Sequence, residues 1–173
     1  MSCRAFGRNA VLLVSCVLMS AITRAADQPD KHRAGFYLIA AQAASADALP
    51  RPTAEQQIAR YDAKFLVPSE RTPAKYLLLP KHADVELKLA KAPNLEKGSN
   101  GFPELRLELT SQAAANLEKL SREHLGQTVS LMIDGEPVTI HKIRSVITGG
   151  QFRLSRCTDN ACEYIRGRLV AEP

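Results

Sequence analysis

The stretch from residue 102 to residue 155 constrains the fold more than any other part of the chain. It begins with FPELRLELT, in which Leu105, Leu107 and Leu109 alternate with charged residues. A period of two places the leucines on one face and the charges on the other, which is typical of a half-buried strand. The pattern therefore predicts a strand whose leucine face must pack against another element.

An amphipathic helix is predicted next. Thr110 precedes it, and its hydroxyl can accept a hydrogen bond from a free amide of the first turn, a contact worth about 1 kcal/mol. Gly126 stands where a left-handed residue commonly ends a helix. We expect one apolar stripe of this helix to pack on the sheet. The stripe comprises Ala113, Leu117, Leu120, His124 and Leu125.

A β-hairpin is predicted after the helix. Residues 129–133 alternate in the manner of a strand, and Asp134 and Gly135 follow at once. Asp-Gly is the favoured chemistry of a two-residue turn that needs positive φ. Val138 and Ile140 then return on the partner strand.

A second change of direction is predicted at Gly149 and Gly150, because glycine permits a sharp corner. Phe152 and Leu154 share one face of the strand that follows. The tail over 159–170 is best described by a helix from its apolar spacing, while a hairpin turning near its start is the alternative.

A close cysteine pair, Cys157 and Cys162, lies at the start of this tail. In an oxidising compartment such a pair is most often a disulfide. Its spacing departs from the Cys-x-x-Cys of redox dithiols, and free thiols or a redox or metal site are the alternatives.

The first residues have the layout of a signal peptide over 1–25. Two arginines precede an apolar run from 10 to 22, which is too short to span a membrane, and small residues around Ala25 suit cleavage. Cys16 ends the letters of a lipoprotein box, but the apolar run continues past it, which argues against a lipid anchor. These features predict an exported, periplasmic protein.

Removal of that segment changes the charge of the protein. Three of the 23 lysines and arginines lie in it and all 18 acidic residues lie beyond it, so the net charge falls from +5 to +2. This near balance argues against a nucleic-acid partner. The exported chain has no second apolar run, and no transmembrane segment is expected in it.

The remaining chain is less regular. Prolines interrupt its short apolar runs, and proline cannot donate to a sheet ladder, so we expect edge or irregular strands there. The predicted parts are a flexible leader with one short strand (35–41) and a linker over 26–53, irregular short strands and loops over 54–101, and an α+β domain over 102–173. Within the second part we expect a helix at 54–63, strands at 64–67 and 75–79, a strand or helical turn at 85–89 and a loop at 91–101.

The order strand, helix, strand, strand, with more strands and a final helix, predicts an α+β fold. We expect a mainly antiparallel sheet with helices on one face.

LTSQAAANLEKLSREHLGQTVSLMIDGEPV, followed by ITGGQFRLS, resembles the head part of the first periplasmic domain of SecD, a component of bacterial protein export. The resemblance rests on Leu109-Thr110, Gly126, Asp134-Gly135 and Ile147-Thr148-Gly149-Gly150, and it covers about a third of the chain. It implies a ferredoxin-like head exposed in the periplasm that contacts exported polypeptide. It supplies no catalytic residue.

Candidate functional residues are few. The histidines show no metal-ligand spacing, and no nucleophile or phosphate-binding motif is present, so we expect no cofactor and no metal. A group of cations near the C-terminus reads either as a solvated sheet face or as a docking surface for an acidic protein or an anionic envelope surface. The candidate binding residues are Lys142, Arg144, Arg153 and Arg156.

These observations favour a non-catalytic, exported module that binds a protein partner or an extended polypeptide, which a free sheet edge can accept as an added strand. An inhibitor or immunity-type protein and a periplasmic enzyme with a dispersed site are the alternatives.

Overall fold

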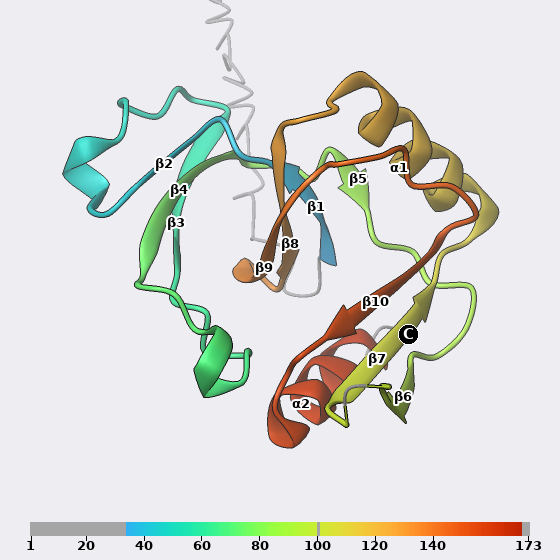
Figure 1. The fold of residues 1–173 in the computed structure, drawn as a ribbon. Helices are drawn as coiled ribbons and strands as arrows, with labels where there is room; N and C mark the ends of the chain where they lie inside the picture. The colour runs from blue at the N-terminus through green and yellow to red at the C-terminus, as the bar shows by residue number, and fades with distance from the viewer. Residues whose placement is uncertain (1–33, 100, 171–173) are drawn as a thin grey trace, which may run out of the picture.

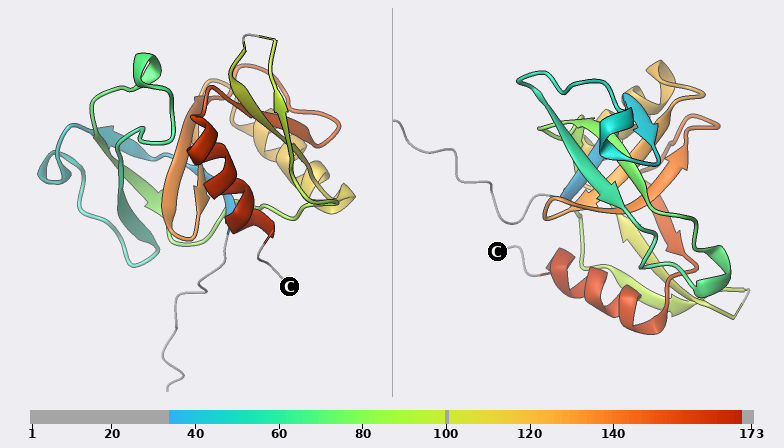
Figure 2. Two further views of the ribbon diagram at one scale, coloured as in Figure 1. Left: turned by 90° about the horizontal axis from the view of Figure 1, so that it is seen from below. Right: turned by 90° about the vertical axis from the view of Figure 1, so that its left-hand side faces the viewer.

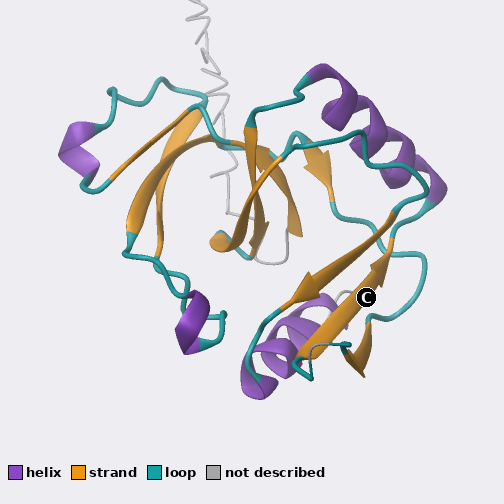
Figure 3. Ribbon diagram, in the orientation of Figure 1, coloured by secondary structure: helices purple, strands orange, loops and turns teal. Residues whose placement is uncertain are grey.

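The structure is a computed structural model that describes residues 34–99 and 101–170. The predicted signal peptide and Cys16 lie outside the described residues. In the described chain, antiparallel strands form three sheets, and two α-helices pack beside them (Figure 1). Strands dominate the architecture, and mostly short loops connect them (Figure 3).

The central sheet has the strand order β5-β1-β8-β9. Its strands are β1 (Ala34–Leu38), β5 (Val85–Glu86), β8 (Thr128–Ile133) and β9 (Glu136–Lys142). Both faces of β8 are covered: Leu131 lies in the larger apolar core, whereas Met132 lies in a smaller one on the opposite face. Alternate side chains of β8 therefore enter two different apolar cores, and neither face of the strand is turned to solvent.

The β8–β9 hairpin turns at Asp134 and Gly135, as predicted. Their φ angles are +51° and +78°, which is the left-handed pair that a two-residue turn requires. The register shifts by one residue between Leu131 and Met132, so β9 carries a bulge. A bulge reverses the alternation, and consequently Val138 faces the larger core while Ile140 packs against the smaller one.

The second sheet has the order β10-β7-β6. Its strands are β6 (Asn94–Lys97), β7 (Pro103–Glu108) and β10 (Gln151–Ser155). The leucine face of the predicted strand is confirmed, since Leu105 and Leu107 are fully buried and Leu109 is 5% exposed. The loop predicted over 91–101 is wrong in part, because β6 pairs there with β7.

Helix α1 (Ser111–Glu123) begins as predicted. The Thr110 hydroxyl accepts a hydrogen bond from the Ala113 amide at 3.4 Å. The helix ends earlier than its apolar stripe, because the backbone at His124 is no longer helical, and Leu125 is therefore 52% exposed. Beyond it, Gly126 has a φ of +84°.

The third sheet has the order β2-β4-β3 and corrects several expectations. Its strands are β2 (Ala41–Ala43), β3 (Gln56–Tyr61) and β4 (Lys75–Pro80), with short 3-10 turns at Ala46–Ala48 and Pro68–Glu70. The helix predicted at 54–63 is wrong, because β3 pairs with β4 throughout. The linker prediction overlooked β2, which pairs with the other edge of β4.

Strand β4 is central, not an edge strand as its prolines suggested. Pro80 ends the strand, so the missing amide interrupts the ladder only at its last residue. The strand predicted at 64–67 is absent; there Leu66 makes only an isolated bridge with Cys157. Of the alternatives at 85–89, the strand is observed as β5.

The tail is a helix, α2 (Asp159–Val170), which confirms the preferred prediction. The Thr158 hydroxyl accepts a hydrogen bond from the Ala161 amide at 3.3 Å. Cys157 and Cys162 form the predicted disulfide, and both are buried. The disulfide joins the chain leaving β10 to the first turn of α2.

The α+β class is confirmed. Helix α1 packs beside β5, whereas α2 packs beneath β7, and the two helices lie well apart (Figure 2). The ferredoxin-like arrangement and the division of the chain at residues 54 and 102 stay predictions. One large core joins the central sheet, the second sheet and both helices, and Phe36 contacts Phe152 across it with ring centroids 5.3 Å apart.

Candidate functional site

The predicted cationic group divides into two pairs. Arg153 forms an ion pair with Glu104 at 3.1 Å, and Arg156 forms one with Glu70 at 2.7 Å. Both guanidinium groups are thus engaged by carboxylates of the same chain. They contribute little net field to a partner.

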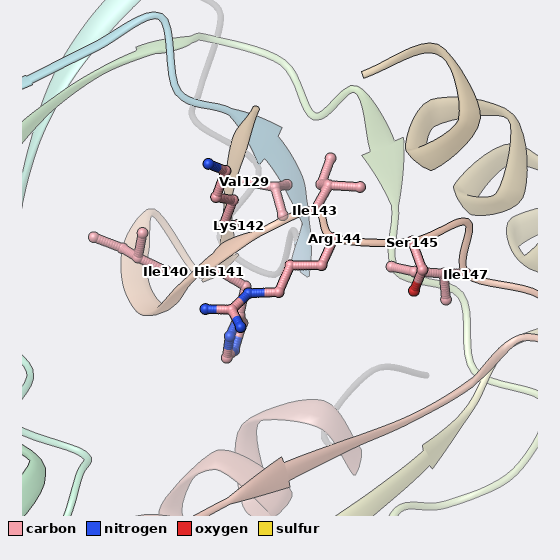
Figure 4. Close-up of a pocket in the computed structure, with 8 residues that line it drawn as sticks. All are labelled: Val129, Ile140, His141, Lys142, Ile143, Arg144, Ser145 and Ile147. Carbon is pink, nitrogen blue, oxygen red and sulfur yellow. The ribbon is translucent and has the colours of Figure 1, made fainter. Parts of the chain in front are cut away.

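Lys142 and Arg144 are different: within the described residues, neither makes an ion pair with a carboxylate. Both line an open cavity of about 480 Å³ beside the end of β9 (Figure 4). Apolar side chains make up much of its wall. The lining residues are Val129, Ile140, His141, Lys142, Ile143, Arg144, Ser145 and Ile147.

The loop that carries half of this lining is anchored to the end of α1. The Ile143 amide donates to the Gln127 carbonyl at 2.8 Å, and the Gly126 amide donates to the Ile143 carbonyl at 2.8 Å. The Ile147 amide donates to the Ser121 hydroxyl at 2.9 Å. These bonds fix the loop, so the cavity is built into the fold.

Ser121 was missed by the sequence reasoning. It is fully buried on α1, and its own hydroxyl donates to the Glu118 carbonyl at 2.9 Å. Ser121 lies four residues after Leu117 and therefore on the apolar stripe of the helix. A polar side chain buried there needs a hydrogen-bond partner, so this position could have indicated its role from the sequence.

His141 and Arg144 project to the same side of β9, and Lys142 projects to the other (Figure 4). The register agrees, since His141 lies opposite Val129 and Lys142 lies opposite Thr128. The His141 side chain is exposed, yet enough protein surrounds its ring that desolvation lowers its pKa below 6.5. At neutral pH the positive charge of this site therefore belongs to Lys142 and Arg144.

The outer edge of β9 is paired with no other described strand. The Thr128 carbonyl accepts from the Ile39 amide at 2.9 Å, so its backbone is turned toward β1. In an antiparallel ladder its partner Lys142 must then direct its N–H and C=O away from β8, and Ile140, two residues earlier, does the same. β9 consequently presents an open edge beside the cavity.

Strand β3 lies beside β9 without pairing with it, and Ile140 packs against the smaller core to which Tyr61 of β3 belongs. Lys64, just after β3, forms an ion pair with Glu136 at the first residue of β9. Hydrogen bonding to Glu136 is the largest cause that raises the pKa of Lys64. This ion pair ties the segment after β3 to the start of β9.

The remaining predicted positions have structural roles. Gly149 and Gly150 make the corner before β10 with φ angles of +75° and +64°. A Cβ atom on Gly150 would lie 2.5 Å from the Cβ of Ala114, so glycine allows the corner to touch α1. In the part of the chain that the structure describes, no group of three or more potential metal ligands occurs.

Comparison with known proteins identifies similar chains. No protein-family model matches this sequence. The protein translocase subunit SecDF of Thermus thermophilus is 35% identical over 51 residues, which are 30% of this chain and 7% of that protein. A solved structure of SecDF, described as a membrane component that enhances protein export, superposes with a TM-score of 0.51 at 20% identity over 82% of this chain and 63% of its own.

The fold and the site together define a small antiparallel α+β domain with an open strand edge beside a cavity. Its fold is similar to that of the solved SecDF chain over 82% of its length. The chain spans only 63% of that solved chain and 7% of the curated relative. Within the described residues, no helix is both long and apolar enough to cross a membrane.

Proposed function

We propose that this protein is an exported, non-catalytic module of the periplasm that binds a protein partner or an extended polypeptide. The SecDF structure it resembles is described as a membrane component that enhances protein export, which supports a role in that context. In this proposal the protein binds polypeptide and catalyses no reaction.

The observation that carries the proposal is the open edge of β9. Unpaired N–H and C=O groups on an edge strand are a template for another strand, and main-chain hydrogen bonds then supply affinity that depends little on sequence. Ile140 and Lys142 direct such groups outward. The adjacent cavity can accept alternate side chains of the added strand.

Hydrogen exchange tests this mode of binding. A short capped peptide that alternates valine and threonine should slow exchange at the outward amides of Ile140 and Lys142. The control is the same peptide with an N-methyl group on every nitrogen, which leaves it no N–H to donate on either edge. Unchanged exchange at saturating peptide, or equal effects of the methylated control, would contradict strand addition.

Cell fractionation tests the location. We expect the protein in the periplasmic extract with a new N-terminus at Ala26, because cleavage is predicted after Ala25. A protein that stays in the cytoplasmic fraction with its first residues intact would contradict export. Recovery of one stoichiometric partner from that extract would favour the inhibitor alternative over a general polypeptide binder.

A further inference from the structure

We propose that the cavity beside β9 selects polypeptide segments in which an acidic residue stands next to an aliphatic one. The inference rests on the strand addition proposed above and names the class of segment that this edge prefers.

The first support is the distribution of charge. The other arginines of the C-terminal region each face a carboxylate of the chain itself: Arg153 faces Glu104, and Arg168 faces Asp134. At Lys142 and Arg144 no such carboxylate is present among the described residues. A visiting carboxylate is therefore attracted here by charge that the protein has not already neutralised.

The second support is the position of Lys142 in the ladder. A strand added to β9 places one of its side chains directly opposite Lys142 at a Cβ separation of about 5 Å, where opposite charges stabilise the pair. The next residue of the visitor points to the other side, where His141 lies and where Val129 forms part of the cavity wall. Alternation thus assigns a carboxylate to one face and an aliphatic side chain to the other.

The third support is the cavity itself. A volume of about 480 Å³ is in the range of specific binding sites, which combine apolar walls with a few polar groups. Val129 and Ile143 are buried parts of the wall, and Arg144 stands at its rim. An aliphatic side chain fills such a site on the face where His141 and Arg144 lie, while the carboxylate of its neighbour meets Lys142 on the other face.

Paired peptides test the selection. A capped peptide that alternates valine and glutamate is compared with one that alternates valine and glutamine, by fluorescence anisotropy. We expect the glutamate peptide to bind roughly ten-fold more tightly at low salt, with most of the difference lost at about 1 M salt.

Matched variants locate the effect. Lys142→Gln should reduce the preference for glutamate roughly two- to five-fold, as expected for one exposed ion pair. Lys119→Gln removes the same charge from an exposed site on α1 and should leave the preference unchanged. Equal losses in the two variants would show general charge attraction and overturn the proposal.

The outcomes also separate this inference from the proposed function. Equal affinity for both peptides, with protection of the β9 amides intact, overturns acidic selection while strand addition stands. No binding of either peptide and no protection removes the proposed function as well. Competition by vesicles of anionic lipid for the glutamate peptide would show that this face docks on a membrane surface, and that result would also overturn the proposal.

Discussion

Arg168 of α2 forms an ion pair with Asp134 at the tip of the β8–β9 hairpin. The Asp134 side chain is 7% exposed, whereas that of Arg168 is 37% exposed. The Arg168 guanidinium also lies over the Tyr164 ring, 5.5 Å from its centroid. The final helix therefore holds the turn of the hairpin whose second strand carries the open edge.

We expect Arg168→Ala to destabilise the domain by about 1–3 kcal/mol, because it removes one charged partner from a largely buried carboxylate. Asp134→Asn should cost less, since asparagine tolerates the left-handed turn and buries no charge. Urea denaturation of both single variants and the double variant measures the coupling. Arg166→Ala, which removes an exposed ion pair with Glu163, is the control. If the effects of the Arg168 and Asp134 substitutions simply add in the double variant, the two side chains do not stabilise each other and the prediction is wrong.

The two glycines of the corner should respond differently to alanine. Both have positive φ, which costs an alanine about 1–2 kcal/mol. Nothing lies within 4 Å of a Cβ on Gly149, whereas one on Gly150 meets the Cβ of Ala114 at 2.5 Å. We therefore expect Gly150→Ala to lower the free energy of unfolding by roughly 2–4 kcal/mol, clearly more than Gly149→Ala. Similar melting temperatures would contradict the close contact.

The leucine face of β7 should be essential for folding. Leu107→Ala is expected to cost about 2–5 kcal/mol because it leaves a cavity in the core, and Leu107→Glu should prevent folding. Leu125→Ala, at an exposed position just beyond α1, should change stability by less than about 0.5 kcal/mol. Circular dichroism with chemical denaturation separates these cases, and a folded Leu107→Glu variant would contradict the proposed core.

Reduction of the Cys157–Cys162 disulfide should destabilise the protein by about 2 kcal/mol, since a loop this short restricts the unfolded chain only modestly. We expect the loss to appear as a lower melting temperature in reductant. The variant in which both cysteines are replaced by alanine serves as the control, because reductant should not change its melting temperature. Unaltered stability of the reduced natural protein would contradict the prediction.

His141 should make stability depend on pH. Its folded pKa is lowered by desolvation, so below the ordinary value of 6.5 the unfolded chain takes up a proton more readily than the folded one. Above pH 6.5 the neutral His141 side chain therefore favours the folded state. The free energy of unfolding falls as the pH decreases from 6.5 toward the pKa of His141 in the folded protein. Between about pH 7 and pH 5.5 the free energy of unfolding should decrease less in His141→Gln than in the natural protein. Chemical denaturation at each pH measures this difference. An identical slope in the two proteins would exclude His141 as its source.

Local patterns determined the elements over residues 102–155. The leucine alternation of β7, the Thr110 cap and the Asp134-Gly135 turn each depend on neighbouring residues, and each appears as predicted. The disulfide followed from two cysteines near each other in a chain expected to be exported. Such features are visible in the sequence because their partners lie only a few residues away.

The site was only partly predictable. Lys142 and Arg144 were named together with Arg153 and Arg156, and only their distant partners, Glu104 and Glu70, separate the two pairs. Ion pairing across the fold leaves no periodicity in the sequence. The cavity likewise depends on Ser121 holding the loop near Ile147, a contact across 26 positions.

The sequence by itself determined the α+β class, the start of the central helix, the hairpin turn and the disulfide, because short-range chemistry and a period of two or 3.6 specify them. Tertiary structure alone decided that residues 56–61 form a strand beside β4, that β8 separates two cores, and that the end of β9 stays open beside a cavity. Strand pairing joins segments that are far apart in the chain, and the stability of such pairs comes from cross-strand neighbours that no local pattern names.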